Sequence, residues 1–239
     1  MTVIYSSPIF GPIHSRRLGV SLGINLMPDD GKCCSFDCIY CECGFNCDFV
    51  PQHSRPTREQ VRMALEAKLV EMKADGLAPD VLTFAGNGEP TLHPDFPCII
   101  DDTIALRDRY FPQANVSVLS NSSQIVRQEI FDALCRVDNN MCKLDTVSAE
   151  YVSMVDRPNG HYVLEDIISQ LNTIAENPAK AIEDYKKATG KGAVGVMPLY
   201  VPEEIIHAAG YLPVGMWGAR KKEISRARTY LPPFACSIM

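Results

Sequence analysis

Two kinds of apolar pattern alternate between residues 18 and 174, and this alternation constrains the fold more than any other feature. Short apolar runs that are typical of strands occur at 18–26, 80–86, 115–123 and 141–148. Apolar residues at helical spacing occur at 57–76, 98–110, 124–137 and 162–174. Repeated strand–helix units predict parallel strands joined by right-handed crossovers. We therefore expect an α/β fold with polar site residues at the carboxyl ends of the strands.

The composition narrows the class of protein and its compartment. Apolar residues make up 46% of the chain, enough for a sizeable core, and the net charge of -6 gives no reason to expect nucleic-acid binding driven by bulk charge. The first residues do not resemble a signal peptide, and no run of 18 apolar residues is present. We expect a cytoplasmic protein without a membrane segment, in which the ten cysteines stay reduced or bind metal.

Five of those cysteines lie in "CCSFDCIYCECG", residues 33–44. Cys34, Cys38 and Cys41 have the spacing C-x3-C-x2-C, whereas a structural zinc site usually joins two separated pairs of ligands. Three thiolates on one loop can hold three irons of a cubane and leave the fourth iron open. We favour a [4Fe–4S] cluster at these three residues, with structural zinc as the alternative. Five further cysteines are not assigned as ligands: Cys43 and Cys47 are either spare thiols or weakly interacting groups around the ligands, and we expect Cys98, Cys135 and Cys142 to be small core residues.

The cysteine loop and its flanks resemble the radical S-adenosylmethionine (SAM) superfamily over residues 5–172. The segments "GPIHSRRLGVSLGINLMPDDGKCCSFDCIYCECG" and "FAGNGEPTLHPDF" are similar to the iron–sulfur oxidoreductases grouped with wyosine-type tRNA synthases. The resemblance implies a (β/α) barrel, here partial and truncated, that reductively cleaves SAM to start radical chemistry on an unknown substrate. A reductant such as flavodoxin or ferredoxin is implied as a partner, and tRNA as a substrate only by analogy.

The same resemblance implies SAM contacts from strand ends and from the cysteine loop. These candidate residues are Tyr40, Gly86, Gly88, Glu89, Asn121, Lys143 and Asp145. Plainer roles stay open for several of them. Glu89 could be a solvated loop carboxylate, Asn121 could form a turn, and Lys143 and Asp145 could be a structural ion pair.

The sequence changes character after residue 174. The segments "MPLYVPEEIIHAAGYLPVGMWG" and "YLPPFACSIM" are similar to the amino-terminal part of 2-hydroxyacyl-CoA dehydratase and benzoyl-CoA reductase subunits. Residues 176–239 carry nine Lys and Arg against six Asp and Glu, whereas residues 1–175 carry fourteen against twenty-three. We therefore expect a radical SAM domain at 1–174 and a small α/β appendage at 175–239, with strands at 193–200 and 211–217.

Two other functions remain open at this point. In one, the second segment defines the activity, and the chain is a dehydratase-type iron–sulfur subunit that acts on an acyl-CoA thioester. In the other, the chain is a metal-stabilised binding module without turnover.

Overall fold

The computed structural model describes residues 3–15, 18–160, 162–175, 190, 193–196 and 212–215. The chain divides into two compact units, residues 1–171 and 172–239, close to the expected junction after residue 174. Among the described residues, every helix is too short or too polar to cross a lipid bilayer.

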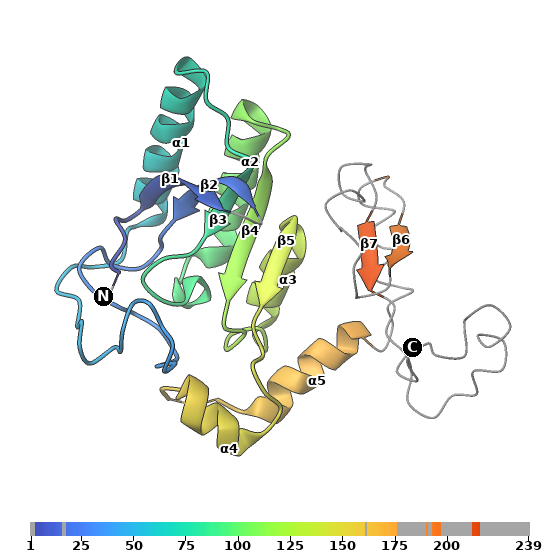
Figure 1. The fold of residues 1–239 in the computed structure, drawn as a ribbon. Helices are drawn as coiled ribbons and strands as arrows, with labels where there is room; N and C mark the ends of the chain where they lie inside the picture. Colours follow the sequence, from blue (N-terminus) through green and yellow to red (C-terminus); the bar gives the residue numbers. More distant parts are fainter. Residues whose placement is uncertain are drawn as a thin grey trace, which may run out of the picture. The chain divides into compact units, whose positions relative to one another are not determined.

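The first unit is built on a five-stranded sheet with the order β1-β2-β3-β4-β5 (Figure 1). Strands β2 to β5 are parallel, and β1 pairs antiparallel with β2 at the edge. The strands are β1 Ile9–Ser15, β2 Gly19–Ile24, β3 Val81–Phe84, β4 Asn115–Ser120 and β5 Asn139–Cys142. None of them contains Asp, Glu, Lys or Arg, and the central strands β2 to β4 are largely buried.

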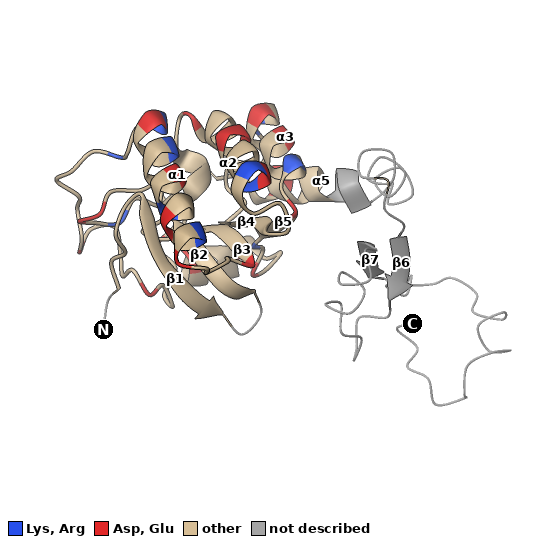
Figure 2. Ribbon diagram, turned by 90° about the horizontal axis from the view of Figure 1, so that it is seen from above, with Lys and Arg blue, Asp and Glu red and all other residues tan. Residues whose placement is uncertain are grey.

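Three helices cover one face of this sheet, and together they form two layers (Figure 2). They are α1 Arg58–Ala74, α2 Phe96–Tyr110 and α3 Gln128–Arg136. Thr57 caps α1 through a capping box, in which its hydroxyl accepts from the Gln60 amide and the Gln60 side chain accepts from the Thr57 amide. Charged residues are frequent on α1–α3, whereas the strands of the sheet are tan (Figure 2).

The hydrophobic core lies between the two layers. Alternate strand residues such as Leu22, Leu82 and Val116 are fully buried there, packed with Leu65 of α1 and Ile100 of α2. Because side chains of a strand alternate between faces, their sequence neighbours point to the opposite face. Burial of the apolar face therefore fixes the register of the strands and the positions of the residues that follow their carboxyl ends.

Shorter elements complete the first unit. A 3₁₀ turn η1 (Pro90–Leu92) follows β3, and α4 (Ala149–Tyr151) with the π-helical η2 (Val152–Asp156) follows β5. Helix α5 (Leu164–Ala175) comes last and contributes Ile167 to the core.

The structure confirms the predicted alternation of strands and helices but corrects some details. Strand β1 and η2 were not predicted, and the fourth predicted strand, 141–148, is instead β5 at 139–142. The expectation that Cys98 and Cys135 lie in the core is wrong, because both are exposed on the helices; Cys142 is half-buried. A partial (β/α) barrel stays a prediction, since the described strands form an α/β sheet of five members.

In the second unit the structure describes two short strands, β6 (Ala193–Val196) and β7 (Leu212–Gly215), which pair in parallel. Both lie inside the predicted strands 193–200 and 211–217.

Candidate metal centre

The candidate site residues follow the carboxyl ends of four neighbouring parallel strands. The cysteine loop follows β2, the segment Gly86–Glu89 follows β3, Asn121 follows β4 and Lys143 follows β5. Because parallel strands end at the same edge of a sheet, the fold brings together residues that lie more than a hundred positions apart in the sequence. The predicted cysteines and the predicted SAM contacts therefore share one edge.

Close backbone contact joins the cysteine loop to the segment after β3. The Cys33 amide donates to the Asn87 carbonyl at 2.9 Å, and the Glu89 amide donates to the Cys33 carbonyl at 3.3 Å. Gly88 lies between these bonds with φ +142°, and a Cβ there would stand 1.9 Å from the Cys33 oxygen. Gly86 is similarly tight, because a Cβ would meet the Asn25 side chain at 2.7 Å. Gly88 is thus required by close backbone approach, and Gly86 by its positive φ of +130° and the buried Asn25 side chain.

Glu89 is buried, and its carboxylate is saturated by protein donors. One oxygen accepts from the Thr91 amide at 3.1 Å, the Thr91 hydroxyl at 2.5 Å and the Ser120 hydroxyl at 2.8 Å. The other accepts from the Asn121 amide at 2.6 Å. Burial raises the pKa of this carboxyl, and the four donors oppose that shift. Glu89 therefore joins the ends of β3 and β4, and it is not a solvated loop carboxylate.

Asn121 connects this junction to the cysteines. Its side-chain amide donates to the Ser35 hydroxyl at 2.9 Å and lies 3.5 Å from the Cys34 sulfur. Its side-chain oxygen accepts from the Ser123 amide at 3.0 Å, which is the turn geometry that the sequence left open. Asn121 thus forms a turn and contacts the cysteine loop at the same time.

Lys143 lies next to Cys38, the second of the three candidate ligands. Its ammonium lies 3.3 Å from the Cys38 sulfur and donates to Asp156 at 2.8 Å and to Asp145 at 3.1 Å. Tyr40 bonds to both Lys143 and Asp145 through its hydroxyl. Burial raises the pKa of the Cys38 thiol, and the positive charge of Lys143 opposes that rise. The ion pair Lys143–Asp145, which the sequence left open as a plainer role, is present, and Lys143 also pairs with Asp156, which was not predicted.

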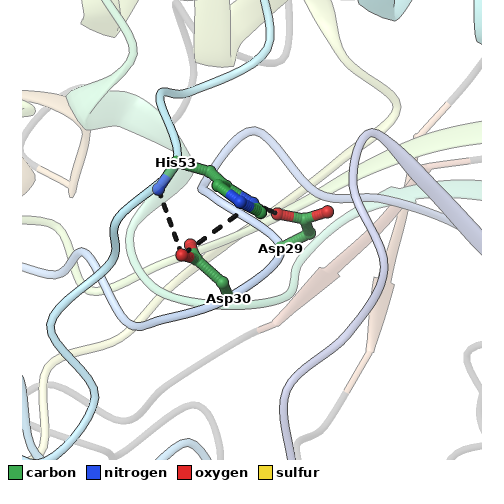
Figure 3. Close-up of side chains that lie close together, drawn as sticks. All are labelled: Asp29, Asp30 and His53. Carbon is green, nitrogen blue, oxygen red and sulfur yellow. Dashed lines mark hydrogen bonds and ion pairs between the residues drawn. The ribbon is translucent and has the colours of Figure 1, made fainter.

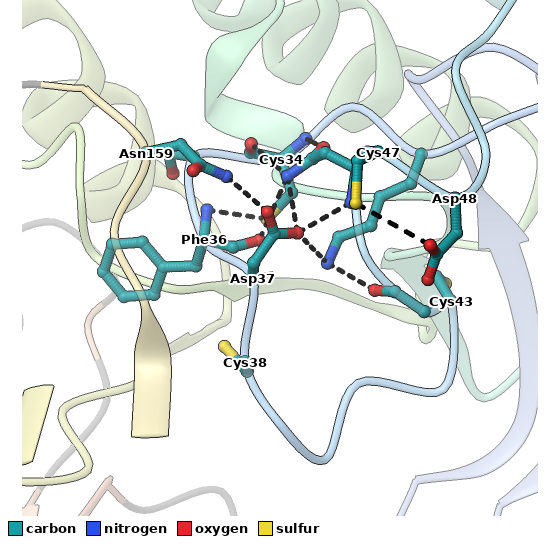
Figure 4. Close-up of polar contacts among 12 residues, drawn as sticks. Cys34, Phe36, Asp37, Cys38, Cys43, Cys47, Asp48 and Asn159 are labelled. Carbon is teal, nitrogen blue, oxygen red and sulfur yellow. Dashed lines mark hydrogen bonds and ion pairs between the residues drawn. The ribbon is translucent and has the colours of Figure 1, made fainter. Parts of the chain in front are cut away.

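Asp37 occupies the centre of the cysteine loop (Figure 4). Its carboxylate accepts from the Asn46 amide at 2.7 Å, the Asn46 side chain at 2.8 Å and the Asn159 side chain at 2.8 Å. Asn46 in turn accepts from the Cys34 amide at 3.0 Å and donates to the Cys34 carbonyl at 3.1 Å. The backbone around Cys34 is therefore fixed by side chains that sequence reasoning missed, since no motif distinguishes Asn46.

The three candidate ligands sit in unlike electrostatic surroundings. Burial raises the pKa of the Cys34 thiol to about 12. A hydrogen bond from the Cys43 thiol lowers the pKa of Cys41 to about 5. A metal ligand must be a thiolate, so the Cys43 thiol favours the ligand form of Cys41, whereas burial disfavours that of Cys34.

The arrangement of the sulfurs bears on which metal fits. Zinc holds four ligands at about 2.3 Å in a tetrahedron, which places neighbouring sulfurs about 3.8 Å apart. Within the described ranges, no three cysteine sulfurs lie within 4.8 Å of one another. A cubane cluster binds each cysteine through a different iron, so its sulfurs are farther apart than those around one ion. The described cysteines therefore do not place three sulfurs around a single ion.

Asp29, Asp30 and His53 do lie within 4.8 Å of one another (Figure 3). His53 Nδ1 is 2.8 Å from Asp29, and one oxygen of Asp30 accepts from the backbone amides of Gln52 and His53 at 2.7 and 3.0 Å. These contacts explain the group as a clasp that ties residues 52–53 to the loop after β2. We assign no metal to it, because its exposed histidine and its bonded carboxylate oxygen already have protein partners.

Comparison with known proteins gives different results for the two parts of the chain. The family model described as 2-hydroxyglutaryl-CoA dehydratase, D-component, matches residues 198–239. The beta subunit of lactoyl-CoA dehydratase from Anaerotignum propionicum is 67% identical over 76 residues, which cover 32% of this chain and 20% of that protein. The beta subunit of (R)-phenyllactyl-CoA dehydratase from Clostridium sporogenes is 47% identical over 75 residues, covering 31% and 20%.

A UPF0026 protein of Methanocaldococcus jannaschii is 31% identical over 169 residues, which cover 70% of this chain and 50% of that protein. That match is longer than the whole second unit, so most of it falls on the first. The chain thus spans between a fifth and half of the length of these curated relatives. The comparisons support the dehydratase resemblance of the second segment. They give no support to the radical SAM resemblance, which rests on the sequence motifs alone.

Proposed function

We propose that the first unit binds a [4Fe–4S] cluster through Cys34, Cys38 and Cys41 and binds SAM beside it for reductive cleavage. The observation that carries this proposal is the position of the cysteine loop, bonded at Cys33 to the segment after β3 at the carboxyl edge of the sheet. When bound, such a cluster supplies one electron and an iron that is open to the amino acid end of SAM.

The residues of the chain would bind and orient the cosubstrate. Lys143 and Asp145 present a positive and a negative group beside Cys38, which suit the carboxylate and the amino group of SAM. Tyr40, whose side chain is 54% exposed, can cover a ligand at the rim. Glu89 supports the site by holding β3 and β4 together, and its backbone amide donates to the Cys33 carbonyl of the cysteine loop.

A second candidate function is favoured by the comparisons, and more directly than the first. The 67% identity with a lactoyl-CoA dehydratase beta subunit supports a dehydratase-type iron–sulfur subunit that acts on a 2-hydroxyacyl-CoA thioester. In that case the second segment would carry the activity, and the first unit would be attached to it. The matched segment falls outside most of the described residues, so this candidate rests on sequence similarity.

One experiment separates these candidates. The full chain is purified and reconstituted without oxygen, and its iron, sulfide and zinc are quantified. Binding of SAM and of lactoyl-CoA is then measured by calorimetry. Iron with sulfide, together with SAM binding, supports the first proposal. Lactoyl-CoA binding without SAM binding supports the second, and stoichiometric zinc without iron would indicate a metal-stabilised binding module.

Two matched variants test the ligand assignment. Cys38→Ala should lose most of the iron, because its buried sulfur is one of three ligands. Cys47→Ala should retain it, because Cys47 is exposed and contacts only the carboxylate of its neighbour Asp48. Equal iron contents in the two variants would contradict the assignment.

A further inference from the structure

Lys32 is a buried cation beneath the cysteine loop. Only 1% of its side chain is exposed, although it directly precedes the cysteine run. Its ammonium donates to the Gly44 carbonyl at 2.7 Å and to Asp37 at 3.2 Å. Removing an ammonium group from water costs several kcal/mol unless partners compensate it, so a lysine here calls for a specific explanation.

These contacts close the loop at both ends. Lys32 stands before the first cysteine, and Gly44 follows the last cysteine of the run. The Gly44 amide also donates to the Cys41 carbonyl at 3.1 Å, so the residue that accepts from Lys32 is itself bonded to the backbone of Cys41. Lys32 therefore holds residues 33–44 as a closed loop and stands below the proposed ligands.

The charge balance supports more than a structural ion pair. Asp37 offers one negative charge and shares it with three amide donors from Asn46 and Asn159. Cysteines become thiolates when they bind metal, so the loaded loop carries additional negative charge. The ammonium of Lys32, bonded to Gly44 and Asp37, is buried beneath this loop. Lys32 is thus a buried cation placed to balance the negative charge that the cysteines acquire when they bind the cluster.

We propose that Lys32 is a positioning residue for the iron–sulfur site, which closes the cysteine loop and supplies the positive charge that stabilises a bound cluster. This inference rests on the proposed function of the first unit. It gives Lys32 a role different from that of Lys143, whose ammonium faces Cys38 at the strand ends and is held by Asp145 and Asp156.

The test replaces the charge while keeping the shape of the side chain. Lys32→Met in the full chain is compared with Lys68→Met, which removes a partly exposed lysine paired with Glu71 on α1. We measure iron and sulfide per chain after anaerobic reconstitution and the midpoint potential of the cluster by a redox titration followed by electron paramagnetic resonance. Lys32→Met should retain less than half of the iron and show a lower potential, whereas Lys68→Met should match the unchanged protein.

A second variant keeps the test decisive if Lys32→Met fails to fold. Asp37→Asn preserves the size of the side chain but removes the negative charge beside Lys32, so the cluster should show a higher potential. A purely structural role would not move the two potentials in opposite directions. The inference alone would be overturned if the protein without substitutions binds the cluster and both variants match it in iron content and in midpoint potential. An unchanged protein that binds no iron would overturn the proposed function and this inference with it.

Discussion

Replacing Glu89 by alanine should destabilise the first unit by about 2–6 kcal/mol. The carboxylate accepts four hydrogen bonds, two of them from the buried backbone amides of Thr91 and Asn121. The hydroxyls of Thr91 and Ser120 can turn toward other acceptors, but the two amides cannot. A buried donor left without a partner costs about 1–3 kcal/mol, which gives the stated range for the pair. This is a large part of the 5–15 kcal/mol typical of a whole domain.

Urea unfolding followed by far-UV circular dichroism would measure this loss in the full chain. Glu71→Ala is the matched control, because that carboxylate is exposed and pairs only with Lys68 in a surface salt bridge worth about 0–1 kcal/mol. Glu89→Gln should fall between the two, since one oxygen remains to accept from Thr91 and Ser120. If Glu89→Ala unfolds within about 0.5 kcal/mol of the control, the carboxylate does not hold the strand ends together and the reasoning fails.

Two further predictions concern the tight backbone contact at Gly88 and the pH dependence of the contact between His53 and Asp29. Gly88→Ala should destabilise the unit by about 1–3 kcal/mol more than Gly160→Ala. Both glycines have positive φ, but only at Gly88 would the added Cβ lie 1.9 Å from a carbonyl oxygen. Equal stabilities in thermal melts would refute this. The hydrogen bond to Asp29 raises the pKa of His53 above its ordinary 6.5, so the clasp stabilises the fold at low pH and weakens as pH rises through that raised value. NMR titration should show a lower His53 pKa in Asp29→Asn, and an identical value would exclude the pairing.

The elements that could be predicted are those whose burial leaves a regular apolar pattern. Helix α1 and strands β3 and β4 are examples, because one face of each packs into the core. Strand β1 could not be predicted, since its sequence "IFGPIHS" contains glycine and proline, which only an edge position tolerates. Strand β5 begins with two asparagines, residues of low strand propensity, and its bounds are set by pairing with β4.

The site was predictable in its location and less so in its contacts. The rule that parallel strands end at one edge places the cysteine loop, Glu89 and Lys143 together. The burial of Glu89 depends on donors more than thirty residues later in the chain, and the contact of Lys32 with Gly44 depends on the path of the loop. Such contacts between distant residues leave no periodic signal in a sequence.

Hydrogen bonds join the amino-terminal segment of the described chain to this site. The Val3 amide donates to the Glu42 carbonyl at 2.9 Å, and the Tyr5 amide and carbonyl bond to the Asn87 side chain, each at 2.8 Å. A purification tag or fusion partner joined ahead of Val3 would therefore emerge beside the cysteine loop and Asn87. A removable tag, cleaved before reconstitution, keeps foreign histidines away from thiols that are meant to receive iron.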